Sequence, residues 1–446
     1  MFRAKKAPVK KTAEEEEEKV NKIKTPVLLR GFRDILPEEQ PYWDRIEDVA
    51  RKISNDYSFG LIRLPILEYT SLFERSVGRG TDIVEKEMFS FVDQGGDKVT
   101  MRPEATAQIA RAYIEHGMIN LPQPVKLWYF GHMFRYNRPQ AGRYRQFWQW
   151  GLEVIGSDEP IIDAQVILMN MRLLQDLGLD VVVHINSIGT PETRLEYTME
   201  LASYFKQFRS KLSEVDKRRL QRNPLRLLDS KEPGMEELKV DAPQIVDWLN
   251  DASKQHFMKV LEYLDEVDIA YELNPYLVRG LDYYNRTVFE ILPVQAEEQK
   301  AQSALCGGGR YDGLIPRLGG REDIGAMGSA MGVERVIIAM KEQGVEVPKR
   351  REIDLFFCQL GEAARRKGLA IFEDFRKEGI QVAEAFGKGS LMAQLELADK
   401  QDAKLSLILG QKEVMDGTII LRDMESGAQE IVDVTKVVDI VKKQLK

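Results

Sequence analysis

The chain contains 446 residues, a length sufficient for two or three domains that each bury a full core. Hydrophobic residues make up 43% and charged residues 30%, which is typical of an ordinary soluble protein. The 71 acidic and 64 basic residues give a net charge of −7, which argues against a general DNA-coating protein. Any contact with RNA must therefore come from a local basic patch.

The cysteine and hydropathy patterns exclude further classes. Cys306 and Cys358 lie far apart, without a neighbouring histidine or second cysteine, which disfavours a zinc site or a disulfide framework. No apolar run reaches membrane-spanning length, and the N-terminus lacks the hydrophobic core of a signal peptide. We therefore expect a cytoplasmic protein with no membrane partner.

The chain begins with a polar segment and then turns regular. Residues 1–24 combine lysines with the acidic run Glu14–Glu18, so we expect a flexible charged tail, with a short charged helix as the alternative. Apolar residues recur at helical spacing from Gln40 to Asp56, and a strand is expected from Gly60 to Leu67. The apolar stripe of this helix consists of Trp43, Ile46, Val49, Ala50 and Ile53.

A carboxylate and a hydroxyl lie two residues apart in the segment MRPEAT. Pro103 favours an extended turn between a strand at Val99–Met101 and a helix at Thr106–His116. On this turn Glu104 and Thr106 offer acceptors that suit an ammonium group, which has three donors to satisfy. In the alternative interpretation Thr106 only caps the helix.

The stretch Lys126–Ile155 is the most informative part of the chain. Two aromatic-rich segments of strand character flank a polar segment with Asn137, Pro139 and Gly142, which predicts an antiparallel hairpin with a basic loop. The stretch contains no acid before Glu153, and arginine forks in such a field can grip phosphate oxygens. Its basic residues are Lys126, Arg135, Arg138, Arg143 and Arg145.

Alternation along these two strands predicts which side chains share a face. Gln149, Gly151 and Glu153 lie on one side of the second strand, so a recess with an amide wall and a carboxylate wall is expected there. Arg135 reaches the same floor if the strands pair in the matching register. The alternative is a surface hairpin whose charges are merely solvated, but an acid beside a glycine gap is poorly explained by packing.

Helical character dominates the middle of the chain. A helix is expected from Ile161 to Leu177 and a strand from Asp180 to Ile185, before a charged helical region at about residues 187–270. That region contains a basic cluster, which we interpret first as the solvated face of a helix. The cluster consists of Lys217, Arg218, Arg219, Arg222 and Arg226.

Three glycine-containing segments follow. YLVRGLDYYNRTVFEIL, residues 276–292, has strand character with a break at Gly280. In CGGGRYDGL, residues 306–314, three consecutive glycines indicate either close approach to a ligand or, more simply, a tight turn. GAMGSAMGVERVI, residues 325–337, predicts a strand that leads into a helix.

After a polar linker at residues 343–351, strands and helices alternate to the end of the chain. This order predicts a compact α/β domain with parallel strands at residues 352–446. No P-loop pattern occurs.

Several of these segments resemble those of one family. FRYNRPQAGRYRQFWQWGLEVIG resembles motif 2 of class II aminoacyl-tRNA synthetases, in the form FRxERPQxGRYRxFxQxGxExxG found in histidyl-tRNA synthetases. LVRGLDYYNRTVFE is nearly identical to the signature peptide of the histidyl enzymes, and CGGGRYDGL resembles another of their segments. The helix and strand near residues 40–67 look like motif 1, which forms the family's dimer interface, and residues 325–337 look like motif 3.

The resemblance implies a fold and an activity. The fold is an α+β catalytic domain built on an antiparallel sheet, at residues 25–345, with a helical insertion, followed by an α/β anticodon-binding domain. The activity is ATP-dependent attachment of L-histidine to tRNA(His) through a histidyl-adenylate, in a homodimer. The family's insertion lies near the acceptor stem of the tRNA, which offers a second interpretation of the basic cluster.

The resemblance also implies roles for single residues at the reaction centre. Arg135 grips the α-phosphate of ATP, and Arg279 bridges that phosphate and the carboxylate of histidine. Glu153 and Tyr284 bind the imidazole ring, Glu104 and Thr106 bind the α-amino group, and Gln149 bridges groups within the pocket. The remaining aromatic residues beside the histidine site are Tyr283 and Tyr311.

Other implied roles lie at the ATP and tRNA ends. Arg335 lies over the adenine ring, and ATP implies Mg²⁺, whose protein ligands the sequence does not identify. Asn137 stands where the family usually has a glutamate that accepts from the adenine amino group, so ATP is expected to bind more weakly or to be read more by backbone groups. The hairpin loop with Arg138, Gln140 and Arg143 is expected to meet the tRNA.

Two rival interpretations remain open. The first is a catalytically silent, synthetase-like regulatory subunit of ATP phosphoribosyltransferase, although such paralogues lack the C-terminal domain and usually the signature arginine. The second is a prolyl- or threonyl-type synthetase, which shares the class motifs but not LVRGLDYYNRTVFE.

Overall fold

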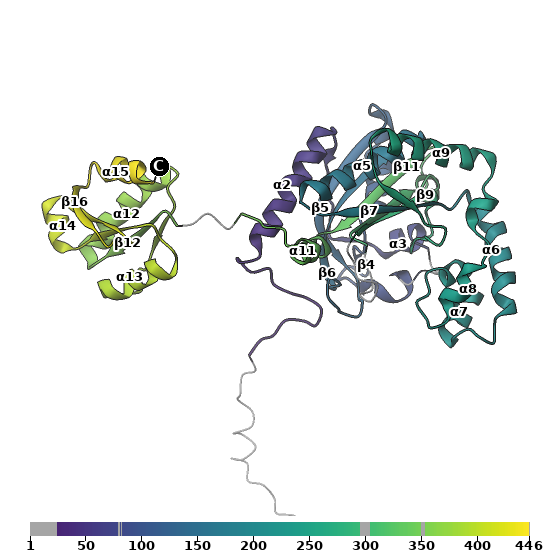
Figure 1. Cartoon of the computed structure of the whole chain (residues 1–446), viewed down its shortest axis with the longest axis horizontal. Coiled ribbons are helices and arrows are strands. Elements are labelled where there is room, and N and C mark those ends of the chain that lie inside the picture. Colours follow the sequence, from purple (N-terminus) through teal and green to yellow (C-terminus); the bar gives the residue numbers. More distant parts are fainter. Residues whose placement is uncertain (1–24, 79–80, 82, 295–303, 349–352, 446) are drawn as a thin grey trace, which may run out of the picture. The chain divides into compact units, whose positions relative to one another are not determined.

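The computed structural model describes residues 25–78, 81, 83–294, 304–348 and 353–445 (Figure 1). The chain divides into two compact units, one ending at Glu346 and the next starting at Val347. The predicted tail at residues 1–24 and residues 349–351 of the predicted linker lie outside the described ranges. Within those ranges, no helix is long and apolar enough to span a bilayer.

The first unit is built on an eight-stranded sheet with the order β1-β5-β6-β11-β10-β9-β7-β8. Its pairs are antiparallel except at the two edges, where β1 pairs with β5 and β7 with β8 in parallel. This result confirms the antiparallel sheet expected from the sequence. The strands are β1 (Gly60–Leu61), β5 (Val125–Phe134), β6 (Gln146–Ile155), β7 (Val181–Ser187), β8 (Tyr271–Leu273), β9 (Asn285–Pro293), β10 (Cys306–Arg310) and β11 (Ala326–Gly332).

The predicted hairpin forms β5 and β6 in the register that the site requires. Gly131 lies opposite Gln149, and Met133 lies opposite Phe147, so the odd-numbered side chains of both strands share a face. β6 also pairs with β11, so the hairpin lies within the sheet. The alternative of a surface hairpin is therefore wrong.

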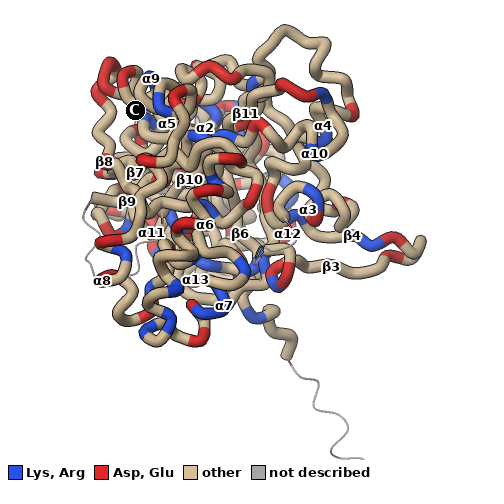
Figure 2. The backbone as a smooth tube through the Cα atoms, turned by 90° about the vertical axis from the view of Figure 1, so that its right-hand side faces the viewer, with Lys and Arg blue, Asp and Glu red and all other residues tan. Residues whose placement is uncertain are grey.

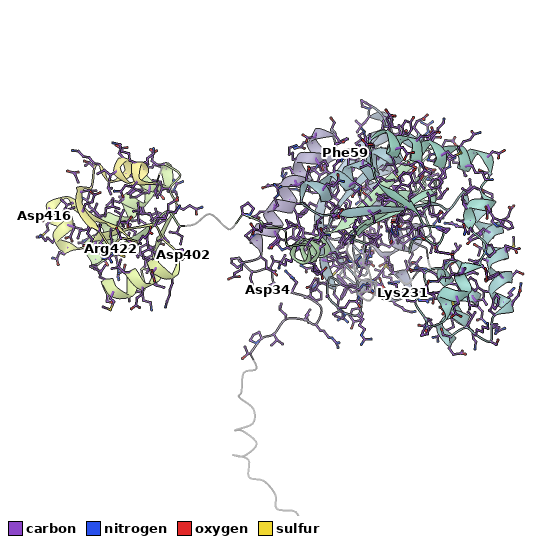
Figure 3. The ribbon with its side chains drawn as sticks, in the orientation of Figure 1. Asp34, Phe59, Lys231, Asp402, Asp416 and Arg422 are labelled. Atoms are coloured by element: carbon purple, nitrogen blue, oxygen red, sulfur yellow. The ribbon has the colours of Figure 1, made fainter. Side chains whose placement is uncertain are left out.

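Four long helices pack beside this sheet: α2 (Gln40–Asp56), α5 (Pro160–Asp176), α9 (Asp251–Glu266) and α11 (Val333–Glu342). α5 contacts α2 and α9, and α11 contacts α2 and β6 (Figure 1). The predicted apolar stripe of α2 is its buried face, as expected for an amphipathic helix. Phe59, labelled in Figure 3, is buried directly after this helix.

A second sheet of three antiparallel strands has the order β2-β4-β3, with β2 at Leu67–Tyr69, β3 at Phe89–Val92 and β4 at Lys98–Met101. The strand expected from Gly60 to Leu67 is wrong, because β1 and β2 belong to different sheets. Between them the Pro65 carbonyl accepts a hydrogen bond from the Gln108 side chain (2.9 Å), outside any strand ladder. The helical elements nearby are α3 (Thr70–Ser76), the π-helix η1 (Ile83–Glu87), α4 (Thr106–Glu115), the 3-10 helix η2 (Met118–Asn120) and α10 (Leu314–Arg317).

A helical insertion separates β7 from β8, as the fold prediction states. Side chains start three of its helices, because Thr190, Ser213 and Asn250 each accept a hydrogen bond from a backbone N–H three residues ahead. α7 carries interspersed basic and acidic residues (Figure 2). In addition to α9, the insertion contains α6 (Pro191–Gln207), α7 (Glu214–Arg222), η3 (Pro224–Leu227), α8 (Met235–Val240) and η4 (Ile245–Trp248).

The second unit is an α/β domain on a five-stranded sheet with the order β13-β12-β14-β15-β16. The prediction of parallel strands holds for β12, β13 and β14 but is wrong for β15, which pairs antiparallel with β14. An additional strand, β16, pairs antiparallel with β15. A parallel connection needs a dozen or more residues, whereas only the short α14 and a turn separate β14 from β15. The elements are β12 (Leu355–Gln359), α12 (Glu362–Lys377), β13 (Val382–Glu384), α13 (Leu391–Lys400), β14 (Leu405–Leu409), α14 (Gln411–Asp416), β15 (Thr418–Asp423), β16 (Gln429–Asp433) and α15 (Val437–Gln444).

Candidate active site

A cavity of about 490 Å³ lies in the first unit and unites segments that are distant in the sequence. The turn before α4, the β5–β6 hairpin, the segment before β9, and α11 all contribute to it. Ten of the residues predicted for the site line this cavity. They are Glu104, Thr106, Arg135, Asn137, Arg143, Gln149, Arg279, Tyr283, Tyr284 and Arg335. The buried Glu153 lies behind the lining, where it accepts a hydrogen bond from Thr106.

Arg135 lies directly after β5, at one wall of the cavity. Its Nε donates to the carbonyl oxygen of Pro103 (2.8 Å), and its guanidinium carbon lies 5.4 Å from the centroid of the Phe147 ring. These contacts fix the plane of the guanidinium at the cavity wall, and they do not occupy its two terminal nitrogens. Such a fork suits a phosphate oxygen pair.

Arg279 faces the same cavity from the segment before β9. It forms an ion pair with Glu290, its guanidinium lies 5.8 Å from the ring centroid of Tyr284, and its Nε has no partner among the described residues. Burial alone lowers the pKa of Arg279, but Glu290 raises it, and the net shift is upward. The group therefore holds a fixed positive charge in a secluded site.

The three consecutive glycines make room for Arg279. Residues 306–310 form strand β10, so the prediction of a tight turn is wrong, and Gly307 lies opposite Glu290 in the ladder. A Cβ atom on Gly307 would lie 2.6 Å from both terminal nitrogens of Arg279. The strand before β9 is also shorter than expected, because β9 starts only at Asn285 and residues 276–284 are irregular.

Gly307→Ala is expected to lower the rate of the reaction at this site by about tenfold or more, because it displaces the guanidinium of Arg279 from its position. The matched control is Gly313→Ala, since a Cβ atom there meets nothing within 4 Å. The measurement is the turnover rate of the reaction at this site with saturating substrates, together with the melting temperature of each variant. Equal rates in the two variants would contradict the role of Gly307.

Glu104 and Gln149 offer unsatisfied acceptors. Glu104 is buried; its Oε1 accepts from the Ala107 N–H (3.0 Å) and its Oε2 has no partner among the described residues. Burial raises the pKa of Glu104, and Arg135 and hydrogen bonds oppose this shift. Gln149 is also buried, and its Oε1 has no partner there either. Both atoms suit the N–H donors of an ammonium group.

Thr106 does not cap α4. Its hydroxyl donates to Oε1 of Glu153 (2.6 Å), and Glu104 satisfies the helix start instead. The alternative of a capping role for Thr106 is therefore wrong. The other oxygen of Glu153 accepts from the hydroxyl of Tyr311, so both residues lie behind the cavity lining. Gly328 leaves space for this carboxylate, because a Cβ atom there would lie 1.8 Å from Oε2.

Burial raises the pKa of Glu153 to about 8, despite hydrogen bonds from Thr106 and Tyr311 that lower it. Between the ordinary value of 4.5 and about 8, the folded protein therefore binds a proton that the unfolded chain has lost. The contribution of this group to stability is present below pH 4.5 and is lost as the pH rises towards 8.

We expect the melting temperature of the ligand-free protein to fall more between pH 5 and pH 9 than that of the variant Glu153→Gln, which cannot titrate. Differential scanning calorimetry of both proteins over this range measures the difference. Parallel pH profiles would contradict the raised pKa of Glu153.

Three tyrosines surround this floor. The ring of Tyr283 lies 4.7 Å from that of Tyr284 and 5.7 Å from that of Tyr311. The recess expected at Gly151 exists, but the ring of Tyr129 occupies it: a Cβ atom on Gly151 would lie 2.3 Å from the Tyr129 ring. Gln149 and Glu153 therefore flank the ring of Tyr129 and not an open gap at Gly151.

The other end of the cavity is basic. Arg335 donates to the Ala304 carbonyl (2.8 Å), and burial, followed by Arg143 and Arg135, lowers its pKa to about 10. Asn137 and Arg143 also line this end. Of the hairpin-loop residues predicted to meet tRNA, Arg138 and Gln140 are exposed and lie outside the cavity lining.

Among the further residues of the cavity are Tyr129, Glu290 and Glu334, which no sequence motif singled out. Tyr129 shares the face of Gly131 and Arg135 by simple alternation, so that signal was present. Glu290 pairs with Arg279 only because β9 and β10 align in a register that no sequence pattern shows. Glu334 accepts from the Trp148 N–H (3.0 Å), and burial raises its pKa to about 7.

The described residues contain no group of three or more His, Cys, Asp or Glu side chains arranged to hold a metal ion. Mg²⁺ commonly keeps several waters and binds substrate phosphates, so an ion that arrives with ATP needs few protein ligands.

Comparisons with known proteins identify relatives of the chain. A model of the family described as histidyl-tRNA synthetase matches residues 31–336, and a model described as anticodon binding domain matches residues 337–444. The chain is 44% identical over 414 residues to the histidine–tRNA ligase of Desulforamulus reducens, which covers 93% of this chain and 98% of that protein. It is also 44% identical over 418 residues to the histidine–tRNA ligase of a Geobacillus species, with the same coverage.

Among solved structures, the apo histidyl-tRNA synthetase of S. aureus matches with a TM-score of 0.77 and 35% identity. The match covers 94% of this chain and 100% of that one. The relatives are thus aligned over nearly their whole length, and the family model alone spans more than half of the chain. The chain belongs to the histidyl-tRNA synthetase family.

Proposed function

We propose that the chain attaches L-histidine to tRNA(His) in two steps. Histidine and ATP first form histidyl-adenylate and pyrophosphate, and the histidyl group then passes to the tRNA with release of AMP. The single observation that supports this most strongly is that Arg135, Arg279, Glu104 and Gln149 line one cavity, with Glu153 one hydrogen bond behind it.

The first step needs little acid–base chemistry. A carboxylate oxygen of histidine attacks the α-phosphorus of ATP, the bond to the bridging oxygen breaks, and pyrophosphate leaves. The demand on the protein is to hold the two reactants in line and to offset the charge on the α-phosphate. Arg135 and Arg279, which face the cavity from different segments, are suited to this task.

At the histidine end of the cavity, the protein supplies hydrogen-bond acceptors in place of cationic donors. The free oxygen atoms of Glu104 and Gln149 accept hydrogen bonds from the α-ammonium group. Glu153 and Tyr284 bind the imidazole of histidine. Thr106 and Tyr311 hold the carboxylate of Glu153 by hydrogen bonds, and the ring of Tyr283 packs against the rings of Tyr284 and Tyr311. A buried site built for two ring nitrogens rejects analogues that leave its polar groups unpaired.

At the ATP end, Arg335 is proposed to lie over the adenine ring and Asn137 to accept from the adenine amino group. Asn137 carries no charge, so this contact is weaker than that of the family's usual glutamate. ATP is proposed to arrive as its Mg²⁺ complex, in which the ion screens the phosphate charge. The chain's own contribution to that screening is the pair of arginines.

The proposed macromolecular partners are tRNA(His) and a second copy of the chain. The exposed Arg138, Gln140 and Arg143 are suited to the acceptor end, and the second unit to the anticodon. A homodimer interface is suggested by apolar side chains at β1 and β2, of which Tyr69 is 60% exposed. Charging of tRNA would place the protein in the cytoplasm.

The alternative of a catalytically silent regulatory subunit is less well supported. Such paralogues lack the C-terminal domain and usually the signature arginine, whereas this chain retains both Arg279 and the matched residues 337–444.

The experiment that tests the proposal is ATP–pyrophosphate exchange with each of the twenty amino acids, followed by charging of total tRNA. Exchange with histidine alone, and transfer to tRNA(His), is the expected result. Exchange with proline or threonine would favour another class II synthetase, and no exchange with any amino acid would favour the regulatory subunit.

A further inference from the structure

The segment that carries Arg279, Tyr283 and Tyr284 has no regular structure of its own. It runs from residue 274 to residue 284, between β8 and β9, and it forms one wall of the cavity. Backbone carbonyl groups in such a segment lack the ladder partners that a strand provides, so other donors must satisfy them. The identity of those donors determines what holds the segment in place.

Asn186 of β7 donates to the carbonyl oxygens of Pro275 (3.4 Å) and Leu277 (3.1 Å) in the first half of the segment. Two arginines of the helical insertion provide the donors for the second half. Arg226 of η3 donates from its terminal nitrogen to the carbonyl oxygen of Gly280 (3.1 Å). Arg194 of α6 donates to the carbonyl oxygens of Tyr284 (2.8 Å) and Asp282 (3.3 Å). Three carbonyls within five residues are thus held by side chains that lie more than 50 positions away in the sequence.

The charge distribution supports the same arrangement. Burial raises the pKa of Asp282, and Arg194, Arg226 and Arg317 act in the opposite direction, so three cations surround one half-buried carboxylate. A second cavity of about 270 Å³ is lined by Arg194 and Arg226 of the insertion and by Arg279 and Asp282 of the segment, and Arg226 also lines the main cavity. Because side chains do not fill this space, the hydrogen bonds from the two arginines add to the restraint that core packing gives the segment.

We infer that Arg194 and Arg226 are positioning residues, which hold segment 274–284 so that Arg279, Tyr283 and Tyr284 face the amino-acid pocket. The helical insertion thereby sets the affinity for histidine. This inference rests on the proposed function, since it assigns the pocket to histidine. It also changes the interpretation of the basic cluster, because Arg226 is directed at the segment and is not part of a solvated face.

The test compares Arg226→Ala, Arg226→Lys and the control Arg209→Ala in ATP–pyrophosphate exchange without tRNA. Arg209 is an exposed arginine of the same insertion, just after α6. Arg226→Ala is expected to raise the KM for histidine about tenfold, because one charge-assisted hydrogen bond to the segment is lost, while the KM for ATP changes less than twofold. Arg226→Lys, which keeps a cationic donor, is expected to recover at least half of this loss.

Histidine binding is measured in parallel by isothermal titration, which does not depend on turnover. If wild-type protein binds no histidine, both the proposed function and this inference fail. If wild-type protein binds histidine and Arg226→Ala binds it equally well, the inference alone fails. An equal rise of both KM values would show a general structural defect and would also overturn it, and Arg194→Lys repeats the comparison if Arg226→Ala does not fold.

Discussion

Replacing Arg279 by glutamine is expected to slow histidine-dependent ATP–pyrophosphate exchange by about 100-fold or more, because a preorganised charge beside the reacting phosphate is lost. Arg279 is held by Glu290, lies against Tyr284 and occupies the space left by Gly307. Its position is therefore fixed before substrates bind, and no reorganisation is needed at the moment of reaction. The loss should fall mainly on kcat, since the charge acts most strongly on the transition state.

The matched control for this variant is Arg376→Gln. Arg376 lies on α12 of the second unit and forms a surface pair with Glu373 (2.9 Å), which contributes little to stability. Single-turnover measurement of adenylate formation compares the two variants at saturating histidine and ATP. If Arg279→Gln keeps more than half of the wild-type rate, Arg279 has no role at the phosphate.

Replacing Glu153 by glutamine is expected to raise the KM for histidine by about 100-fold and to change the KM for ATP far less. The carboxylate lies behind Thr106, and both of its oxygens accept hydrogen bonds from hydroxyl groups that can rotate to suit a ligand. Although burial raises the pKa of Glu153 to about 8 in the ligand-free protein, an imidazole N–H favours its ionised form, whose two oxygens accept from Thr106, Tyr311 and the ring together. An amide has one acceptor oxygen and cannot take the charged form. A buried donor would then remain unpaired whenever histidine binds.

The control for this variant is Glu373→Gln, an equally small change at an exposed site. Steady-state exchange kinetics with histidine and ATP varied in turn give the two KM values. A similar rise in both values would mean that Glu153 supports the fold of the cavity, and the assignment to the imidazole would then be wrong.

Much of the fold could be predicted from the regular spacing of apolar residues, which repeats every two residues in a strand and about every 3.6 residues in a helix. Alternation over β5 and β6 predicted a common face for Gln149, Glu153 and Arg135, and the helical stripe predicted the buried side of α2. The errors arose where partners far away in the chain decide the structure. Pro65 lies between two different sheets, and β15 of the second unit reverses direction because its connection to β14 is short.

At the candidate site, too, local motifs were informative and distant partners were not predictable. The motifs predicted which side chains take part in the reaction, but the sequence did not show which groups hold those side chains in place. Glycines at 307 and 328 make room for a guanidinium and a carboxylate, and this need arises only from the strand register. Likewise, nothing in the local pattern of residues 274–284 indicates that Arg194 and Arg226 hold its backbone.

The effect of Asn137 remains a prediction of the sequence analysis. Its side chain lines the same cavity as Arg335 and Arg143, and if adenine binds there, an amide oxygen can accept a hydrogen bond without adding a negative charge.

The most direct test of the whole account is a crystal structure of the chain with a non-hydrolysable analogue of histidyl-adenylate. We predict that the phosphate-like group lies between the guanidinium groups of Arg135 and Arg279, and that the imidazole ring reaches the carboxylate of Glu153. An analogue that binds in another cavity, or whose ring points away from Glu153 while the two arginines contact nothing, would contradict the account.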